Sequence, residues 1–298
     1  MERVKLRARA KINLSIDIKD ILEDGYHEVE MVMQSINLSD YIIIRKAETG
    51  FKMTSSNSDV PSNKKNIMYK TWILMKEEFG IDGGIEIFLE KNIPIAAGMA
   101  GGSADSAAVF IGINRLFGLN LSDDELIELS KKLGSDIAFC IKGGTYLASG
   151  KGTDLKKLNN FNWDIVMLIC KPNIFVSTKR VYKKYDKMYE SISTDQRPDN
   201  EKIIEGLQLE DYELMVEGMN NVLEPVTKSW YREIDKIEKT MIKGGAIKSM
   251  MSGSGPTVFG FFKDYKSAKR CGNILRKRYS QTYITHASNK GVEICGNK

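Results

Sequence analysis

The clearest chemical signal in this sequence is a glycine-rich stretch at residues 94–108, which reads PIAAGMAGGSADSAA. Its glycines permit backbone angles and close approaches that a side chain would prevent. Ser103 and Asp105 are residue types that cap helices, and a periodic apolar pattern from Val109 to Phe117 predicts a helix directly behind the loop. Because a helix N-terminus offers unpaired N–H groups and partial positive charge, the stretch predicts an anion site, most often for phosphate. A plain structural turn before a small-residue helix is the alternative.

Several well-known phosphate-binding patterns are missing from the sequence. It contains no Walker-type loop, no dinucleotide fingerprint after a strand, and no protein-kinase catalytic set. A phosphate site at residues 94–108 therefore belongs to some other class.

Three further polar features qualify as partners for this loop, although each also has an ordinary structural explanation. Apolar residues occupy every even position from 4 to 18, which predicts one long strand, or two joined at a bend, with Lys11 and Asn13 on its polar face. Asp136 follows a helix stop at Gly134, where an aspartate commonly caps the next helix. Residues 252–255, Ser-Gly-Ser-Gly, are typical of a tight connection between strands.

The elements that must position these residues alternate between strands and helices without strict βαβ repeats, which predicts an α+β fold. In the first half we expect strands at 41–45 and 85–89, a helix at 66–79, and a helix that opens on a capping box at 122–125. In the second half we expect strands at 164–170, 257–262 and 282–287, helices at 209–223, 229–243 and 264–279, and a polar surface loop at 190–201. The polar stretch 151–162 predicts a boundary between domains 1–155 and 156–298.

Composition narrows the class of protein further. The 298 residues carry a net charge of +5, spread along the chain without a basic stripe rich in aromatics, so nucleic-acid binding is not expected. Four scattered cysteines and two histidines argue against a zinc site, a disulfide framework and a serine–histidine hydrolase. No stretch approaches the length of a membrane span, and the charged, alternating N-terminus lacks the apolar core of a signal peptide. The scattered cysteines fit reduced thiols in a cytoplasmic protein.

The combination of three stretches resembles a known superfamily. Residues 8–14, 94–108 and 251–256 match, in order, the three motifs of the galactokinase, homoserine kinase, mevalonate kinase and phosphomevalonate kinase (GHMP) superfamily. Residues 25–27, Gly-Tyr-His, and residues 133–136, Leu-Gly-Ser-Asp, are most similar to the branch that phosphorylates a cytidine diphosphate derivative of methylerythritol. The resemblance implies a two-domain α+β kinase fold, with an N-terminal ATP-binding domain and a ferredoxin-like C-terminal domain.

The resemblance also implies roles for individual residues. Asp136 would be the catalytic base for the substrate hydroxyl, and Lys11 would pair with it and keep it ionised. ATP would bring Mg²⁺ with it and would bind Asn66, Ile67, Lys91 and the loop residues Pro94, Ile95, Ala96, Ala97, Gly98, Met99, Ala100, Gly101, Gly102, Ser103 and Ala104. Ala100 and Ala104 depart from the family motif, so we expect backbone N–H groups, Ser103 and the helix end to provide most of the phosphate contacts.

For the second substrate, the resemblance implies that Tyr26 and Tyr182 stack on the cytosine and that His27 bonds its edge. Asn13 and Thr178 would contact its polar groups, and the turn formed by Ser252, Gly253, Ser254 and Gly255 would close the cleft. We expect a monomer or a weak homodimer, with neither nucleic acid nor membrane as a partner. Two alternatives stay open: a related kinase of homoserine or mevalonate type, and a non-catalytic nucleotide-binding or RNA-binding regulator on the same scaffold.

Overall fold

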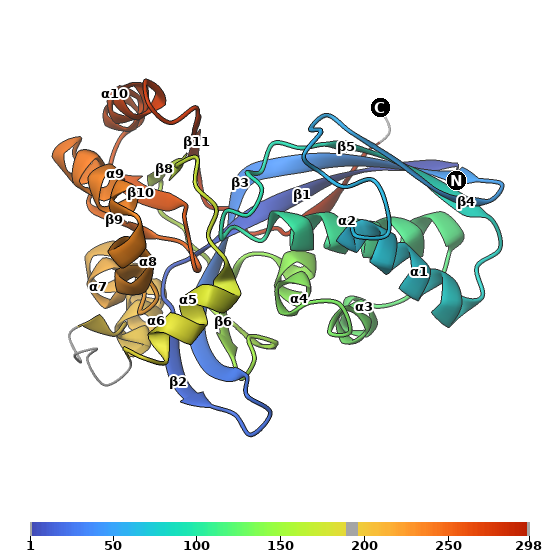
Figure 1. The fold of residues 1–298 in the computed structure, drawn as a ribbon, viewed down its shortest axis with the longest axis horizontal. Helices are drawn as coiled ribbons and strands as arrows, with labels where there is room; N and C mark the ends of the chain where they lie inside the picture. Colours follow the sequence, from blue (N-terminus) through green and yellow to red (C-terminus); the bar gives the residue numbers. More distant parts are fainter. Residues whose placement is uncertain (1, 189–195, 297–298) are drawn as a thin grey trace.

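The computed structural model describes residues 2–188 and 196–296, which form two β-sheets with helices packed against each (Figure 1). Part of the predicted loop 190–201 lies outside the described residues. Within those residues, no helix has the length and apolar character that crossing a membrane requires.

The larger sheet is built around two long strands, β1 (Arg3–Asn13) and β3 (His27–Ala47), which pair antiparallel. The even positions of β1 are fully buried in the core, as the alternation predicts. The break between β1 and β2 at residues 14–16 agrees with the predicted bend. The other strands of this sheet are β2 (Asp17–Ile21), β4 (Gly50–Ser55), β5 (Gly84–Glu90), β6 (Thr145–Ser149), β7 (Asp154–Lys157) and β12 (Val292–Cys295).

Four helices cover one face of this sheet: α1 (Ile67–Phe79), α2 (Gly101–Phe117), α3 (Asp123–Ser130) and α4 (Ser135–Lys142) (Figure 1). The predicted helix at 66–79 is confirmed as α1, and its N-cap is Asn66, whose side chain accepts from the Met68 N–H over 2.8 Å. The predicted capping box of α3 is also present.

The predicted capping of α2 by Ser103 or Asp105 is wrong. Its N-cap is Ala100, in the left-handed conformation at φ 55°, and no side chain caps the helix. The helix therefore begins inside the glycine-rich stretch, and its first N–H groups have no side-chain partner at the N-terminus.

The second sheet is four-stranded and antiparallel, in the order β11-β8-β10-β9. Its strands are β8 (Val166–Lys171), β9 (Lys248–Met251), β10 (Val258–Phe262) and β11 (Gln281–Thr285), with α9 (Arg232–Lys243) and α10 (Tyr265–Arg276) packed against them. The strand order and the two helices give the βαββαβ arrangement of a ferredoxin-like domain, as expected.

Among the described residues of the long connection between β8 and α9, four shorter helices form: α5 (Thr178–Tyr185), α6 (Asn200–Leu209), α7 (Tyr212–Gly218) and α8 (Glu224–Trp230). The predicted single helix at 209–223 is wrong. Glu210, at φ 54°, ends α6, the Asp211 side chain caps α7, and α7 already ends at Met219, where the backbone is extended. The predicted loop 190–201 is wrong at its C-terminal end, because α6 begins at Asn200.

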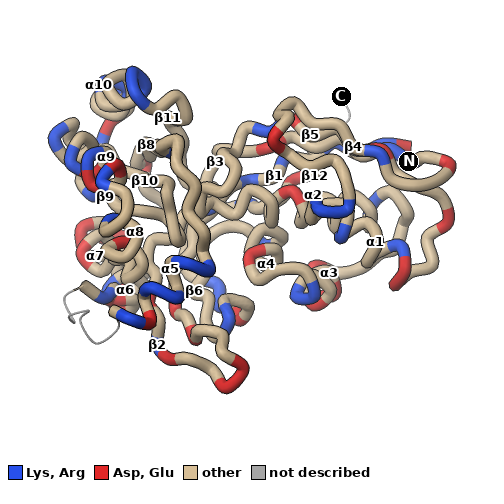
Figure 2. The backbone as a smooth tube through the Cα atoms, viewed as in Figure 1, with Lys and Arg blue, Asp and Glu red and all other residues tan. Residues whose placement is uncertain are grey.

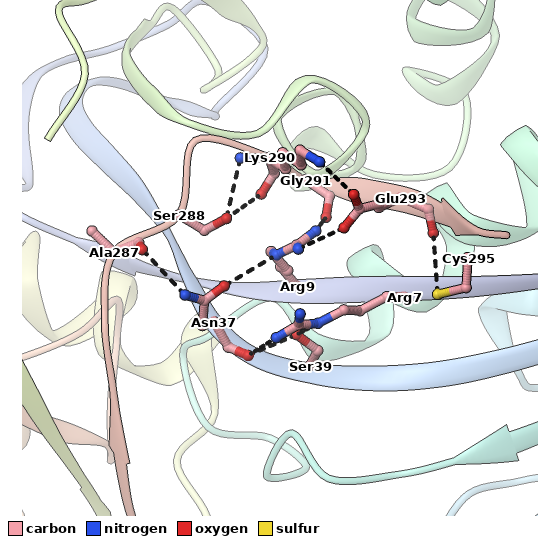
Figure 3. A network of polar contacts seen from close by, with 10 residues as sticks. All are labelled: Arg7, Arg9, Asn37, Ser39, Ala287, Ser288, Lys290, Gly291, Glu293 and Cys295. Carbon is pink, nitrogen blue, oxygen red and sulfur yellow. Dashed lines mark hydrogen bonds and ion pairs between the residues drawn. The ribbon is translucent and has the colours of Figure 1, made fainter. Parts of the chain in front are cut away.

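The C-terminal segment returns to the first sheet and adds β12 beside β1, antiparallel (Figure 3). Arg9 anchors it, because its guanidinium donates to Glu293 Oε2 over 2.8 Å and to the Gly291 carbonyl over 3.3 Å. Glu293 also accepts from Lys290. The two ends of the chain are therefore joined in one sheet.

Charged residues are distributed over both parts of the molecule. Lys and Arg alternate with Asp and Glu along the backbone, and α5 carries a concentration of basic residues (Figure 2). The hydrophobic residues of α5, Val181 and Tyr185, face the core, so its lysines occupy the outer face.

Candidate active site

A cavity of about 550 Å³ lies where β1, the glycine-rich loop and α4 meet α5 and the turn after β9. Most of the residues singled out in the sequence line it, although they come from distant parts of the chain. They are Lys11, Asn13, Asn66, Ile67, Lys91, Pro94, Ile95, Ala96, Ala97, Gly98, Ala100, Gly101, Gly102, Asp136, Thr178, Tyr182, Gly253 and Ser254.

The other predicted residues do not line this cavity. Met99 and Ala104 are fully buried, and Ser103 is half-buried in the first turn of α2. Tyr26 is 64% exposed, and His27 lies behind Tyr182 with the ring centroids 4.7 Å apart. Ser252 and Gly255 belong to the same turn as the two lining residues Gly253 and Ser254, but both are buried.

Lys11 and Asp136 meet at one end of the cavity. Lys11 Nζ lies 3.9 Å from Asp136 Oδ1 and donates to Asn13 Oδ1 over 2.6 Å. The lysine is 4% exposed on β1, whereas the carboxylate stands in the first turn of α4 with its side chain 34% exposed. The arrangement places a buried cation behind a carboxylate that is open to the cavity, a geometry that suits a general base.

The glycine-rich loop is held from behind by the turn that follows β9. Ser252 Oγ donates to the Gly98 carbonyl over 3.0 Å and accepts from the Asn13 N–H over 3.2 Å. Gly98 has φ 70°, and a Cβ there would lie 2.3 Å from the Ser252 carbonyl oxygen. This glycine is required because backbone, not a movable side chain, occupies the space.

The loop also makes a backbone contact with β1, because the Lys11 N–H donates to the Met99 carbonyl over 3.2 Å. Strand, loop and C-terminal turn are therefore joined by hydrogen bonds around the start of α2. Gly101 and Gly102, at the start of α2, line the cavity, so a helix N-terminus is open to it, an arrangement that favours a bound anion.

Lys91 is already engaged by protein carboxylates. Its ammonium lies 2.6 Å from Asp40 Oδ2 and 2.6 Å from Asp105 Oδ2, and all three side chains are buried. Asp40 and Asp105 were not among the predicted site residues. The only hint in the sequence is Asp105, an acidic residue among small residues on the inner side of the predicted helix. No local pattern links it to Asp40.

Tyr182, Thr178 and Ser254 also line the cavity, and the His27 ring packs against Tyr182. His27 Nε2 lies 2.5 Å from Asp186 Oδ1, and the Thr178 and Ser254 hydroxyls share a hydrogen bond of 2.8 Å. Burial raises the pKa of Tyr182 to about 12, so its phenol is neutral at physiological pH. Tyr26 does not line the cavity, and Lys151 Nζ lies 5.0 Å from the centre of its ring.

Comparison with known proteins agrees with this fold. The model of the GHMP kinase N-terminal domain matches residues 66–144, and the model of the GHMP kinase C-terminal domain matches residues 203–281. A crystal structure of homoserine kinase from Cytophaga hutchinsonii superposes with a TM-score of 0.76 at 20% identity, covering 99% of this chain and 98% of the other. The chain belongs to the GHMP kinases and is a small-molecule kinase.

A narrower family follows from closer relatives. The 4-diphosphocytidyl-2-C-methyl-D-erythritol kinase of Clostridioides difficile is 48% identical over 297 residues, which cover 99% of each chain. A crystal structure of 4-(cytidine 5'-diphospho)-2C-methyl-D-erythritol kinase superposes with a TM-score of 0.78 at 26% identity, covering 95% of this chain and 99% of the other. Within the GHMP kinases, the chain belongs to the 4-diphosphocytidyl-2-C-methyl-D-erythritol kinase family.

Proposed function

We propose that this protein transfers the γ-phosphoryl group of ATP to the 2-hydroxyl of 4-diphosphocytidyl-2-C-methyl-D-erythritol, a step in isoprenoid precursor synthesis. The Lys11–Asp136 pair carries the proposal, because it faces the cavity that the glycine-rich loop lines. The names of the relatives and the family membership support the choice of substrate.

In this mechanism, Asp136 accepts the proton of the attacking hydroxyl as its oxygen bonds to the γ-phosphorus. The bond between that phosphorus and the β–γ bridging oxygen breaks, and ADP leaves. Lys11 offsets negative charge near the attacking oxygen, while Asn13 fixes the lysine through its 2.6 Å hydrogen bond.

ATP would occupy the side of the cavity formed by Asn66, Ile67 and the loop 94–104, with its phosphates at the start of α2. Lys91 would support the loop from behind and not bind phosphate directly, because its ammonium already pairs with two carboxylates. Ala100 and Ala104 offer no polar side-chain atom, so the contacts would come from backbone N–H groups, Ser103 and the helix end.

Magnesium would enter with ATP and neutralise charge on its phosphates. Among the residues that the structure describes, no cluster of three His, Cys, Asp or Glu side chains is placed to hold a metal ion. We therefore expect the ion to be held mainly by phosphate oxygens and water. Mg²⁺ commonly binds in this way, because it gives up its water reluctantly.

The cytidine would bind near Tyr182, His27 and Thr178. Tyr182 lines the cavity and offers a stacking face, whereas Tyr26 would need to turn inward from its exposed position to reach the other face of the base. We further propose that residues 1–155 bind ATP and residues 156–298 complete the substrate side. The protein would act in the cytoplasm as a monomer or weak homodimer, without nucleic-acid or membrane partners.

An assay of ADP release separates this proposal from its alternatives. The purified protein is supplied with MgATP and one alcohol at a time: 4-diphosphocytidyl-2-C-methyl-D-erythritol, homoserine or mevalonate. The proposal expects turnover with the first compound and none with the others. Turnover with another alcohol would identify a different kinase, and nucleotide binding without any phosphorylation would identify a non-catalytic binder.

A further inference from the structure

A buried group of three charged side chains, Asp40, Lys91 and Asp105, lies beneath the glycine-rich loop. Its two carboxylates are unequally bonded. Asp40 Oδ2 bonds Lys91, and its Oδ1 accepts from the Asn92 and Ile93 N–H groups over 2.6 and 2.8 Å. Asp105 Oδ2 also bonds Lys91, but its Oδ1 is buried and has no hydrogen-bond partner among the described residues.

This group lies close to where the nucleotide phosphates are expected. Lys91 and Asp105 both line the cavity. A Cβ on Gly101, the first residue of α2, would lie 3.2 Å from Lys91 Nζ. The three charges therefore stand directly behind the first turn of α2.

With both carboxylates ionised, the group has one positive and two negative charges, and hence a net charge of −1. An anionic carboxylate on the first turns of α2 would share the positive helix end with an incoming phosphate and repel it. A carboxylate buried with one unpaired oxygen is costly, which makes Asp105 the member best suited to become neutral.

The electrostatic surroundings of Asp105 agree with this choice. Burial raises its pKa well above the ordinary value and Asp40, on β3, adds to that, whereas Lys91, which follows β5, opposes it. The Cys140 thiol on α4 also interacts electrostatically with Asp105, but burial raises the pKa of this thiol and keeps it neutral. Lys11 and Asp136 act on Cys140 from the cavity side.

We propose that Asp105 takes up a proton when nucleotide binds, so that binding of ATP by this enzyme is coupled to protonation beneath the phosphate loop. A proton from the buffer adds to the unpartnered Oδ1 and converts the carboxylate to a carboxylic acid. Asp40 and Lys91 then remain as a neutral ion pair, and the helix end is left free to attract phosphate. This inference rests on the proposed binding of ATP in the cavity.

Isothermal titration calorimetry with a non-hydrolysable ATP analogue tests the coupling. The binding enthalpy is measured in several buffers of different ionisation enthalpy, because its slope against that enthalpy counts the protons exchanged. We expect net uptake, reaching at most about one proton, within the band of pH that lies between the Asp105 pKa values of the free and bound protein.

Two variants assign the proton to a residue. Asp105→Asn should still bind the analogue but lose the uptake, whereas Asp136→Asn, which alters the exposed carboxylate of the same cavity, should retain it. Uptake that persists in Asp105→Asn, or that disappears in Asp136→Asn alone, would overturn the assignment. Failure of the wild-type protein to bind the analogue would refute the proposed ATP site itself, whereas binding without proton exchange at any pH would refute this inference alone.

A measurement on the wild-type protein covers the case in which Asp105→Asn does not fold. The comparison is made above the last pKa of the analogue's own phosphates, determined by titrating the analogue alone, so that their charge is constant. Affinity for the analogue should then weaken with rising pH, by up to about tenfold per pH unit inside the band where the proton is taken up. An affinity independent of pH across this range, together with zero proton uptake, would contradict the proposal.

Discussion

Ser252 Oγ lies 3.0 Å from the carbonyl oxygen of Gly98 and donates a hydrogen bond to it, joining the turn after β9 to the glycine-rich loop. The same hydroxyl accepts from the Asn13 N–H on β1. One buried serine thus links three segments that are remote in sequence. The shape of the loop depends on this link as well as on its own glycines.

Gly98→Ala should destabilise the protein and weaken its binding of ATP. The substitution forces an alanine to φ 70° and places its Cβ 2.3 Å from the Ser252 carbonyl oxygen. We expect the free energy of unfolding to fall by about 1–3 kcal/mol, the range for a strained backbone position. Denaturant titration measures the change.

Gly102→Ala provides the matched control in the same loop. A Cβ there would meet no atom closer than Ile67 Cγ2 at 3.9 Å, and its φ is not positive. Alanine is also a better helix former than glycine, so stability should stay the same or rise by up to about 1 kcal/mol. Equal losses in both variants would contradict the role given to Gly98.

Asp136→Asn should reduce kcat by about 10²–10⁴-fold, because an amide cannot accept the hydroxyl proton. Affinity for ATP, measured by titration calorimetry, should be largely retained. The control is Asp124→Asn, which removes an exposed carboxylate of α3 that pairs with Lys142 outside the cavity. Turnover close to that of the wild type in Asp136→Asn would rule out its role as the base.

Tyr182→Ala and Tyr26→Ala address the cytidine site. Loss of one stacking partner costs about 1–3 kcal/mol, so each variant should raise the KM for the cytidine substrate and leave the KM for ATP unchanged. Steady-state kinetics with each substrate varied in turn provides the measurement, and Tyr265→Ala, an exposed tyrosine on α10, is the control. If only Tyr182→Ala has an effect, Tyr26 keeps its exposed position against Lys151 during catalysis.

Glu293 should make the free energy of unfolding depend on pH in the acidic range. Hydrogen bonds from Lys290 and Arg9 lower its pKa to about 2, from an ordinary value of 4.5 (Figure 3). The folded state therefore holds this proton less tightly than the unfolded state. The stabilising effect is complete above pH 4.5 and is lost as the pH falls toward 2.

The measurement compares the wild type with Glu293→Gln by chemical denaturation across this range of pH. The difference in unfolding free energy should be largest near neutral pH and should shrink steadily as the pH falls through 4.5 toward 2. A difference that does not change with pH would mean that the Glu293 side chain stabilises β12 by packing and not through its charge.

Much of the local structure follows from the sequence because its causes are local. The alternation in residues 4–18 predicts the strands on either side of a bend, and Asn66, Gly80 and the box at Ser122–Glu125 mark helix ends through contacts within a few residues. The helix expected at 209–223 is shorter in the structure: Asp211 caps α7 at its start, the backbone becomes extended at Met219, and Asn221 bonds the distant carbonyls of Met251 and Gly253.

By itself, the sequence determined the motifs, the α+β class, the family resemblance and most of the residues that line the cavity, since these depend on residue type and short spacing. Tertiary structure alone decided which charges meet. It buried Lys11 in the wall of the cavity, divided Lys91 between Asp40 and Asp105, and kept Tyr26 outside the cavity. Pairing across β1, β3, β5 and α2 sets those distances, and residues so far apart in sequence leave no local pattern that records them.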